Sequence, residues 1–195
     1  MFKKLLAIFL FFGFSSYAEL PADFAQSCIA LVQPYAHNQQ LQSEQILLVP
    51  VQNRAEIAYN QELVSNDGSY LRYKANCYFE PQTNQIQFVT GPEVEPENLK
   101  KLCLIAALDG AKQKYGTESV VLPQSMAQMN NLTAEIEPTA TGGNIFKFAF
   151  YFNERLIKHW KVPPLTKTKI NCVVTQPDAS KPNLETQASF DAKFR

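Results

Sequence analysis

Alternation of apolar and polar residues predicts two strands with particular clarity. Between residues 145 and 152 every second position holds a phenylalanine: Phe146, Phe148, Phe150 and Phe152. Because the side chains of a strand point alternately to opposite faces, the four rings share one face, and that face has to be buried. From Tyr70 to Glu80 the odd positions are apolar and most even positions are polar, which predicts a half-buried strand.

Helical spacing of apolar residues occurs in two places. In residues 21–35 the apolar positions recur on one helix face, and Cys28 belongs to that face. Residues 97–115 predict the more regular helix, because Pro96 suits a first helical position and Gly116 suits a C-terminal cap. The middle of this helix is apolar nearly all round, so we expect other elements to cover it on more than one side.

Shorter apolar runs, separated by turns of hairpin length, complete the pattern. They predict strands at residues 46–51, 56–64, 86–90, 118–122, 133–137, 156–162 and 169–176. Asp67-Gly68 between two of these runs is a strong hairpin signal. We therefore predict an α+β fold with mostly antiparallel strands, as a single domain over residues 19–176. It divides into two helix-plus-antiparallel-sheet halves, residues 19–92 and 93–176, which repeat the layout without clear residue identity.

The two ends of the chain are expected to lie outside this domain. Lys3 and Lys4 precede an apolar run that ends near Phe14, and small residues follow, so residues 1–18 resemble a secretory signal peptide. The apolar run is too short for a membrane anchor, which needs roughly 20 residues. Residues 177–195 are polar and predict a largely disordered tail. These features predict a periplasmic or secreted protein without a transmembrane anchor.

Four cysteines remain after removal of the leader: Cys28, Cys77, Cys103 and Cys172. An even number in an exported chain predicts two disulfides, and their spacing suits neither a zinc site nor a redox pair. One hypothesis pairs Cys28 with Cys77 and Cys103 with Cys172, so that each disulfide joins a helix to its own sheet. The alternative joins helix to helix and strand to strand, as Cys28–Cys103 and Cys77–Cys172.

Charge is balanced overall but unevenly distributed. The full chain has 18 basic and 18 acidic residues, and loss of Lys3 and Lys4 leaves 16 against 18, a net charge of −2. Nothing in this balance indicates nucleic-acid binding. Residues 145–169 are nevertheless strongly basic, and the predicted hairpin at residues 145–162 combines cations with the only tryptophan. The candidate partner-binding residues there are Lys147, Arg155, Lys158, His159, Trp160 and Lys161. Alternatively, Trp160 caps the phenylalanine core while the lysines extend into water.

Few catalytic chemistries are supported by the sequence. The two histidines, His37 and His159, belong to no compact metal-ligand motif, and no GxSxG or SxxK motif occurs. We therefore expect no metal, no cofactor and no catalytic residue that can be assigned. A Ser-His-Asp triad whose members are far apart in the chain cannot be recognised from the sequence, so a small secreted hydrolase remains the alternative.

The leading functional hypothesis is an exported, soluble binding or accessory protein of the cell envelope, of the inhibitor, immunity or assembly type. Its basic, aromatic hairpin would contact an acidic protein or an anionic envelope component. A third possibility is a structural envelope component whose tail or edge strand pairs with itself.

Overall fold

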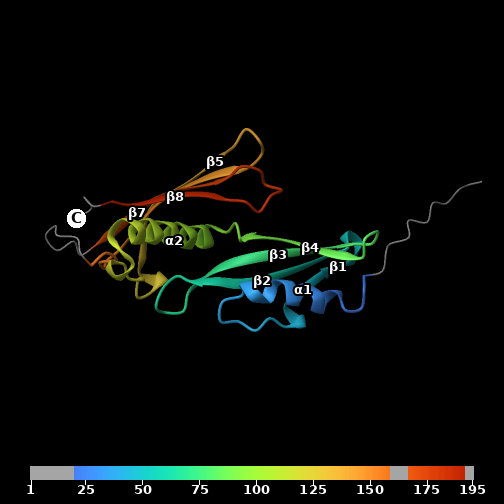
Figure 1. Ribbon diagram of the computed structural model, residues 1–195. Coiled ribbons are helices and arrows are strands. Elements are labelled where there is room, and N and C mark those ends of the chain that lie inside the picture. The colour runs from blue at the N-terminus through green and yellow to red at the C-terminus, as the bar shows by residue number, and fades with distance from the viewer. Residues whose placement is uncertain (1–19, 159–166, 192–195) are drawn as a thin grey trace, which may run out of the picture.

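The computed structural model describes residues 20–158 and 167–191, and each half of the chain forms one helix and one four-stranded sheet (Figure 1). The first half contains α1 (Phe24–Val32), β1 (Ile46–Val49), β2 (Arg54–Leu63), β3 (Tyr70–Glu80) and β4 (Gln85–Pro92). The second half contains α2 (Pro96–Tyr115), β5 (Met129–Pro138), β6 (Asn144–Phe152), β7 (Thr168–Gln176) and β8 (Glu185–Asp191). In both sheets each strand pairs antiparallel with its neighbour in sequence, which confirms the α+β class and its two halves.

α1 covers one face of the first sheet, as the alternation in β3 requires. The odd positions of β3 form the apolar face, on which Leu71, Ala75 and Cys77 are buried. Cys28 on the inner side of α1 forms a disulfide with Cys77. Burial of alternate side chains and this covalent link hold the helix on its sheet.

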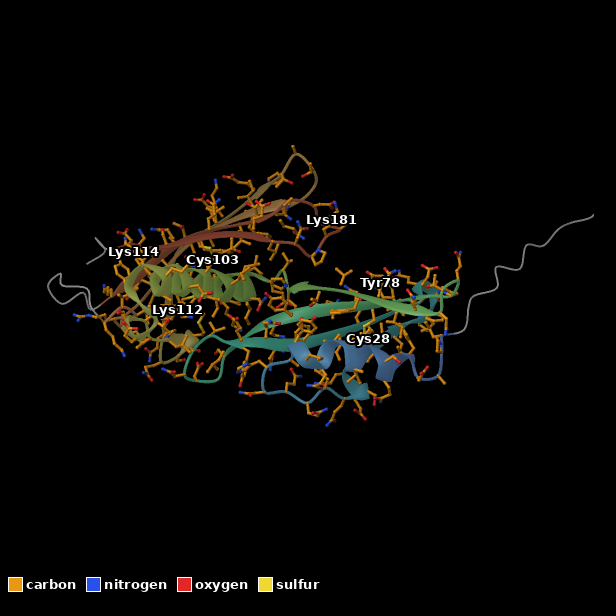
Figure 2. The ribbon with its side chains drawn as sticks, in the orientation of Figure 1. Cys28, Tyr78, Cys103, Lys112, Lys114 and Lys181 are labelled. Atoms are coloured by element: carbon orange, nitrogen blue, oxygen red, sulfur yellow. A yellow bond between two sulfur atoms is a disulfide. The ribbon has the colours of Figure 1, made fainter. Side chains whose placement is uncertain are left out.

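α2 packs on β7 and β8 of the second sheet (Figure 1). The four phenylalanines of β6 are all buried in the core beneath this helix, as their period of two predicts. Cys103 on α2 forms a disulfide with Cys172 on β7. The structure therefore confirms the helix-to-sheet pairing in both halves, and Figure 2 places Cys28 and Cys103 in their separate halves.

The two halves share side-chain and backbone contacts. Val64 and Leu71 of the first half belong to the same apolar cluster as α2 and β6. Asn98 in the first turn of α2 is buried. Its side-chain amide accepts a hydrogen bond from Arg72 N–H on β3 at 2.8 Å and donates one to the Arg72 carbonyl at 2.9 Å. Gly91 on β4 lies so close to Pro182 that a Cβ at this position would clash with the Pro182 carbonyl oxygen.

The β2–β3 turn also docks on the second half. The Asp67 carboxylate accepts a hydrogen bond from the Ser125 hydroxyl at 2.5 Å and one from the Met126 backbone N–H at 3.3 Å. It also accepts bonds from Ser65 and Ser69 within its own turn. These bonds to the charged form lower the pKa of Asp67, with that from Ser125 the largest cause.

Three local predictions differ from the structure. Residues 185–191, which we expect to belong to a disordered tail, form the edge strand β8. The neighbours of β6 are β5 and β7, so the hairpin predicted between residues 145–152 and 156–162 is wrong. Leu156 and Ile157 are both buried, and Ile157 forms a single antiparallel bridge with Val120. Residues 159–162 of the predicted strand lie outside the described residues. Residues 118–122 form a short 3-10 turn and a single bridge rather than a strand.

Candidate functional site

The six residues predicted to bind a partner are separated by the structure. Lys147 lies on β6 with its ammonium 2.6 Å from the Glu137 carboxylate on β5, so it forms an ion pair within the sheet. Its hydrogen bond to Glu137 raises the pKa of Lys147. Arg155 and Lys158 are exposed in the connection that follows β6. His159, Trp160 and Lys161 lie outside the described residues, so their predicted role stays a prediction.

The connection after β6 runs beside the segment that follows α2. Val121 N–H donates to the Leu156 carbonyl at 3.0 Å, and Lys158 N–H donates to the Ser119 carbonyl at 2.8 Å. The Ser119 hydroxyl donates to the Tyr115 carbonyl at the last residue of α2, also at 2.8 Å. Ser119 therefore links the backbone at Lys158 directly to the C-terminal end of α2.

This contact brings two distant groups of cations to one end of the molecule. We call Lys112, Lys114, Arg155 and Lys158 the basic end, and Figure 2 shows the first two at the C-terminal end of α2. Lys112 pairs with Asp109 at 2.8 Å, and Lys114 lies over the Tyr115 ring. Among the residues that the structure describes, no ion pair is found for Arg155 or Lys158. These two exposed cations are therefore available to a partner.

The sequence indicated only part of this arrangement. Lysines near the end of a helix mark its solvent-exposed surface, and they also suit the negative end of the helix dipole. Nothing in their spacing shows that a segment some forty residues later in the chain lies beside them. That information comes from the backbone bonds of Ser119 and Val121.

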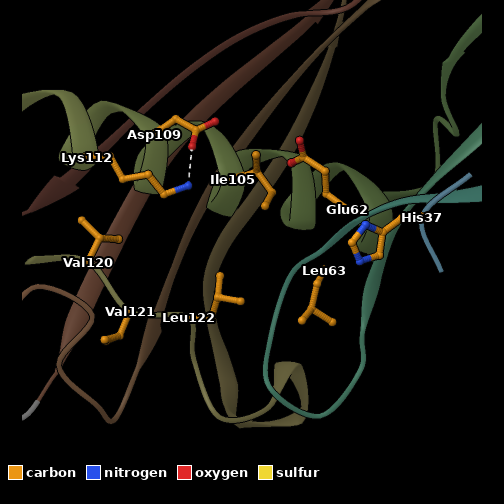
Figure 3. Close-up of a pocket in the computed structure, with 9 residues that line it drawn as sticks. All are labelled: His37, Glu62, Leu63, Ile105, Asp109, Lys112, Val120, Val121 and Leu122. Atoms are coloured by element: carbon orange, nitrogen blue, oxygen red, sulfur yellow. Dashed lines mark hydrogen bonds and ion pairs between the residues drawn. The ribbon is translucent and has the colours of Figure 1, made fainter. Parts of the chain in front are cut away.

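A pocket of about 470 Å³ adjoins the basic end and is shared by both halves (Figure 3). Its walls are mostly aliphatic, and charged groups stand at its rim. The lining residues are His37, Glu62, Leu63, Ile105, Asp109, Lys112, Val120, Val121 and Leu122. Lys112 belongs both to this pocket and to the basic end, so the two features form one continuous surface.

The pocket lacks the constellation of a hydrolase. His37 N–H donates to the Asn60 carbonyl at 2.6 Å, and the His37 ring contacts Tyr70 with ring centroids 5.8 Å apart. The residues that line the pocket include Glu62 and Asp109 but no serine, threonine or cysteine. A triad built on His37 therefore has no nucleophile in this pocket. His159, the other candidate base, is among the residues that are not described.

A second groove, of about 460 Å³, lies between the outer face of the first sheet and the β7–β8 loop. Exposed Tyr78 and Val89 line one side, and Lys181 and Pro182 line the other. Figure 2 labels Tyr78 and Lys181 on the two halves that border this groove. The groove has no histidine among its lining residues, and its one serine hydroxyl, that of Ser180, donates to the Asp178 carboxylate at 2.7 Å.

The perturbed pKa values in the described part of the chain have structural causes. Burial raises the pKa of Tyr59, whose hydroxyl lies 2.6 Å from the Thr90 hydroxyl in the first core. Burial also raises the pKa of Tyr73. Neither residue lines the two pockets described above. No group of three potential metal ligands occurs within residues 20–158 and 167–191.

Comparison with known proteins gives no family for this chain. No protein-family model matches it, and neither a curated protein nor a solved structure shows significant similarity. Within the described ranges, no helix has both the length and the apolarity needed to cross a membrane. The functional argument therefore depends on the geometry alone.

Proposed function

We propose that this chain is an exported binding or accessory protein that recognises an acidic protein surface through its basic end and the adjoining pocket. The observation that carries the proposal is the position of Arg155 and Lys158. Both are exposed, and neither has an ion pair among the described residues. The backbone of their connection is hydrogen-bonded to the segment that directly follows α2 and its terminal lysines. Cations in this arrangement accelerate association with an acidic partner and make it dependent on salt.

The adjoining pocket favours a protein partner over a purely electrostatic one. Interfaces commonly combine an apolar anchor in a pocket with charges at the rim. The pocket of Figure 3 has aliphatic walls around Ile105 and Val121, and Lys112 connects its rim to the basic end. A partner with an apolar side chain flanked by carboxylates would fit both features at once.

The expected location agrees with the chemistry of the chain. Two disulfides are typical of proteins that fold in an oxidising compartment, and the first residues resemble a secretory leader. We therefore propose a periplasmic or secreted protein. The hydrolase alternative has less support, since no described pocket combines a histidine with a hydroxyl or thiol nucleophile.

The test is a charge reversal with a matched control. Affinity capture of the tagged mature chain from an envelope extract of its own source should retain an acidic protein that high salt releases. Arg155→Glu combined with Lys158→Glu should abolish this retention. Lys101→Glu combined with Lys181→Glu changes the net charge equally but leaves the basic end intact, and it should retain the partner.

Two results would contradict the proposal. The first is equal retention by both double variants at every salt concentration. The second is binding of the chain to phosphatidylglycerol vesicles but to no protein, which would assign the basic end to an anionic membrane surface. To test the pocket separately, Ile105→Phe should weaken capture by a factor that does not change with salt, because it fills apolar space rather than removing charge.

A further inference from the structure

The outer edge of the second sheet lacks a strand partner in the described part of the chain. β5 pairs with β6 on one side, and the sheet ends there. Residues 131–138 are exposed on both faces. An edge strand of this length presents backbone N–H and C=O groups that can pair with another strand.

The same edge carries an apolar row. The pairing register places Ala134 opposite Phe148 and Ile136 opposite Phe146, so both lie on the face that the phenylalanines bury. α2 packs on β7 and β8, towards the edge of the sheet opposite β5 (Figure 1). Ile136 is consequently 59% exposed, and Leu132, the extra residue of a β-bulge, is 44% exposed. Exposed aliphatic side chains beside an unpaired edge are typical of a protein-binding strand.

The two carboxylates of β5 share a single ammonium within the chain, which leaves a net charge of −1 at this edge. Glu137 forms an ion pair with Lys147, and Glu135 lies directly opposite Lys147 in the register of the sheet. β5 therefore offers little net charge to attract a charged foreign strand. Recognition at this edge would depend on matching apolar and neutral groups.

We propose that β5 pairs antiparallel with β5 of a second copy, so that two second sheets form one continuous sheet across a twofold axis. The sequence of the strand is complementary to itself in one register. With Ala134 opposite Ala134 of the other copy, Ile136 faces Leu132 and Glu135 faces Thr133. Apolar groups then meet apolar groups, and no carboxylate faces another carboxylate. A register centred on Glu135 would oppose two carboxylates and is disfavoured.

The first experiment measures oligomeric state. Light scattering of the mature chain over a wide concentration range should show a reversible monomer–dimer equilibrium. Ile136→Lys should weaken the dimer about tenfold or more. The symmetric interface loses both of its Ile136–Leu132 pairs and gains two charges. Leu47→Lys is the matched control. Leu47 is 62% exposed on the edge strand β1, and its substitution should leave the equilibrium unchanged.

Two further variants test the register. Thr133→Lys would place an ammonium opposite the Glu135 carboxylate of the other copy, so the dimer should tighten at low salt and lose that gain at high salt. Ala134→Cys should be joined by a short bismaleimide crosslinker into a dimer, whereas Leu47→Cys should not.

Clear outcomes overturn the inference. A chain that remains monomeric at every concentration has no self-pairing β5. A dimer that Ile136→Lys leaves intact, or that Ala134→Cys does not crosslink, uses another surface. These variants leave Lys112, Lys114, Arg155 and Lys158 unchanged, so the result is independent of the partner proposed for the basic end.

Discussion

The buried amide of Asn98 connects the first turn of α2 to the first sheet. The Asn98 side chain accepts a hydrogen bond from Arg72 N–H and donates to the carbonyls of Arg72 and Glu93, the latter at 2.8 Å. The Arg72 carbonyl also accepts a hydrogen bond from Glu93 N–H at 3.1 Å, so the Asn98 amide completes a small network between β3 and the start of α2. A buried backbone group left without a partner costs about 1–3 kcal/mol.

We predict that Asn98→Ala lowers the free energy of unfolding by about 3 kcal/mol, since three hydrogen bonds are lost in a buried position. Urea unfolding followed by circular dichroism measures this change. Asn130→Ala is the control, because its amide donates one exposed bond to the Gln128 carbonyl, and the expected loss is small. An equal effect of the two substitutions would show that Asn98 does not hold β3.

Asp67 makes stability depend on acid pH. Its folded pKa is lowered from an ordinary value of 3.8, first by the hydrogen bond from Ser125 and then by that from Ser65. A lowered folded pKa stabilises the protein above the unfolded pKa, and this contribution is lost as the pH falls toward the folded value. Asp67→Asn should therefore reduce stability most at neutral pH, and its difference from the wild type should shrink steadily as the pH falls below 3.8.

The measurement compares urea midpoints of Asp67→Asn and the wild-type chain from pH 2 to pH 7. Asp23→Asn serves as a control at an exposed position before α1. Curves for wild type and Asp67→Asn that remain parallel over the whole range would contradict the pKa shift.

At the scale of elements, two glycines should respond in opposite directions to the same substitution. Gly110 lies inside α2 with open space around its Cα, so Gly110→Ala should stabilise the chain by about 0.5–1 kcal/mol. Gly91 on β4 faces the Pro182 backbone. Gly91→Ala should destabilise the chain, because the β7–β8 loop that contains Pro182 would have to move away. Thermal unfolding of the two variants tests the pair, and a stabilising Gly91→Ala would refute the close contact.

The elements that the sequence predicts correctly are those with a local pattern. The period of two in the phenylalanine strand, and the flanking Pro96 and Gly116 of α2, depend on neighbouring residues alone. The sequence left two disulfide pairings open, and the structure decides between them because each helix cysteine faces the sheet that comes after it.

The elements that the sequence misses depend on tertiary contacts. β8 has a weak alternation of Thr186, Ala188 and Phe190, and it becomes a strand because β7 supplies hydrogen bonds and α2 covers its inner face. Residues 156–158 look like a strand from composition. In the structure, the Thr168 hydroxyl donates to the Glu154 carbonyl and accepts from Leu156 N–H, which holds this segment as a connection between β6 and β7.

The candidate site also combines features that the sequence indicates with features that only tertiary packing creates. Exposure of Arg155 and Lys158 follows from the sequence, whereas the attachment of their connection to the end of α2 and the shared pocket follow from packing. No periodicity could have shown that His37 and Val121 line one cavity, because the residues come from different halves.

At the scale of the whole molecule, the halves share one apolar cluster and therefore should unfold together. Val64 and Leu71 contribute to the core of α2 and β6, and the Asp67 turn adds hydrogen bonds across the same boundary. We predict a single calorimetric transition with equal calorimetric and van't Hoff enthalpies. Two resolved transitions would show that the boundary is too weak to couple the halves.

Each disulfide joins a helix to the third strand of its own sheet, and neither passes from one half to the other. Between β4 and α2 the only covalent link is the backbone of residues 93–95. A protease that cut there would leave two separate polypeptides, each internally crosslinked, that adhere only through packing and hydrogen bonds. Expressed as two genes, such fragments would form a split protein whose reassembly could be switched by dilution.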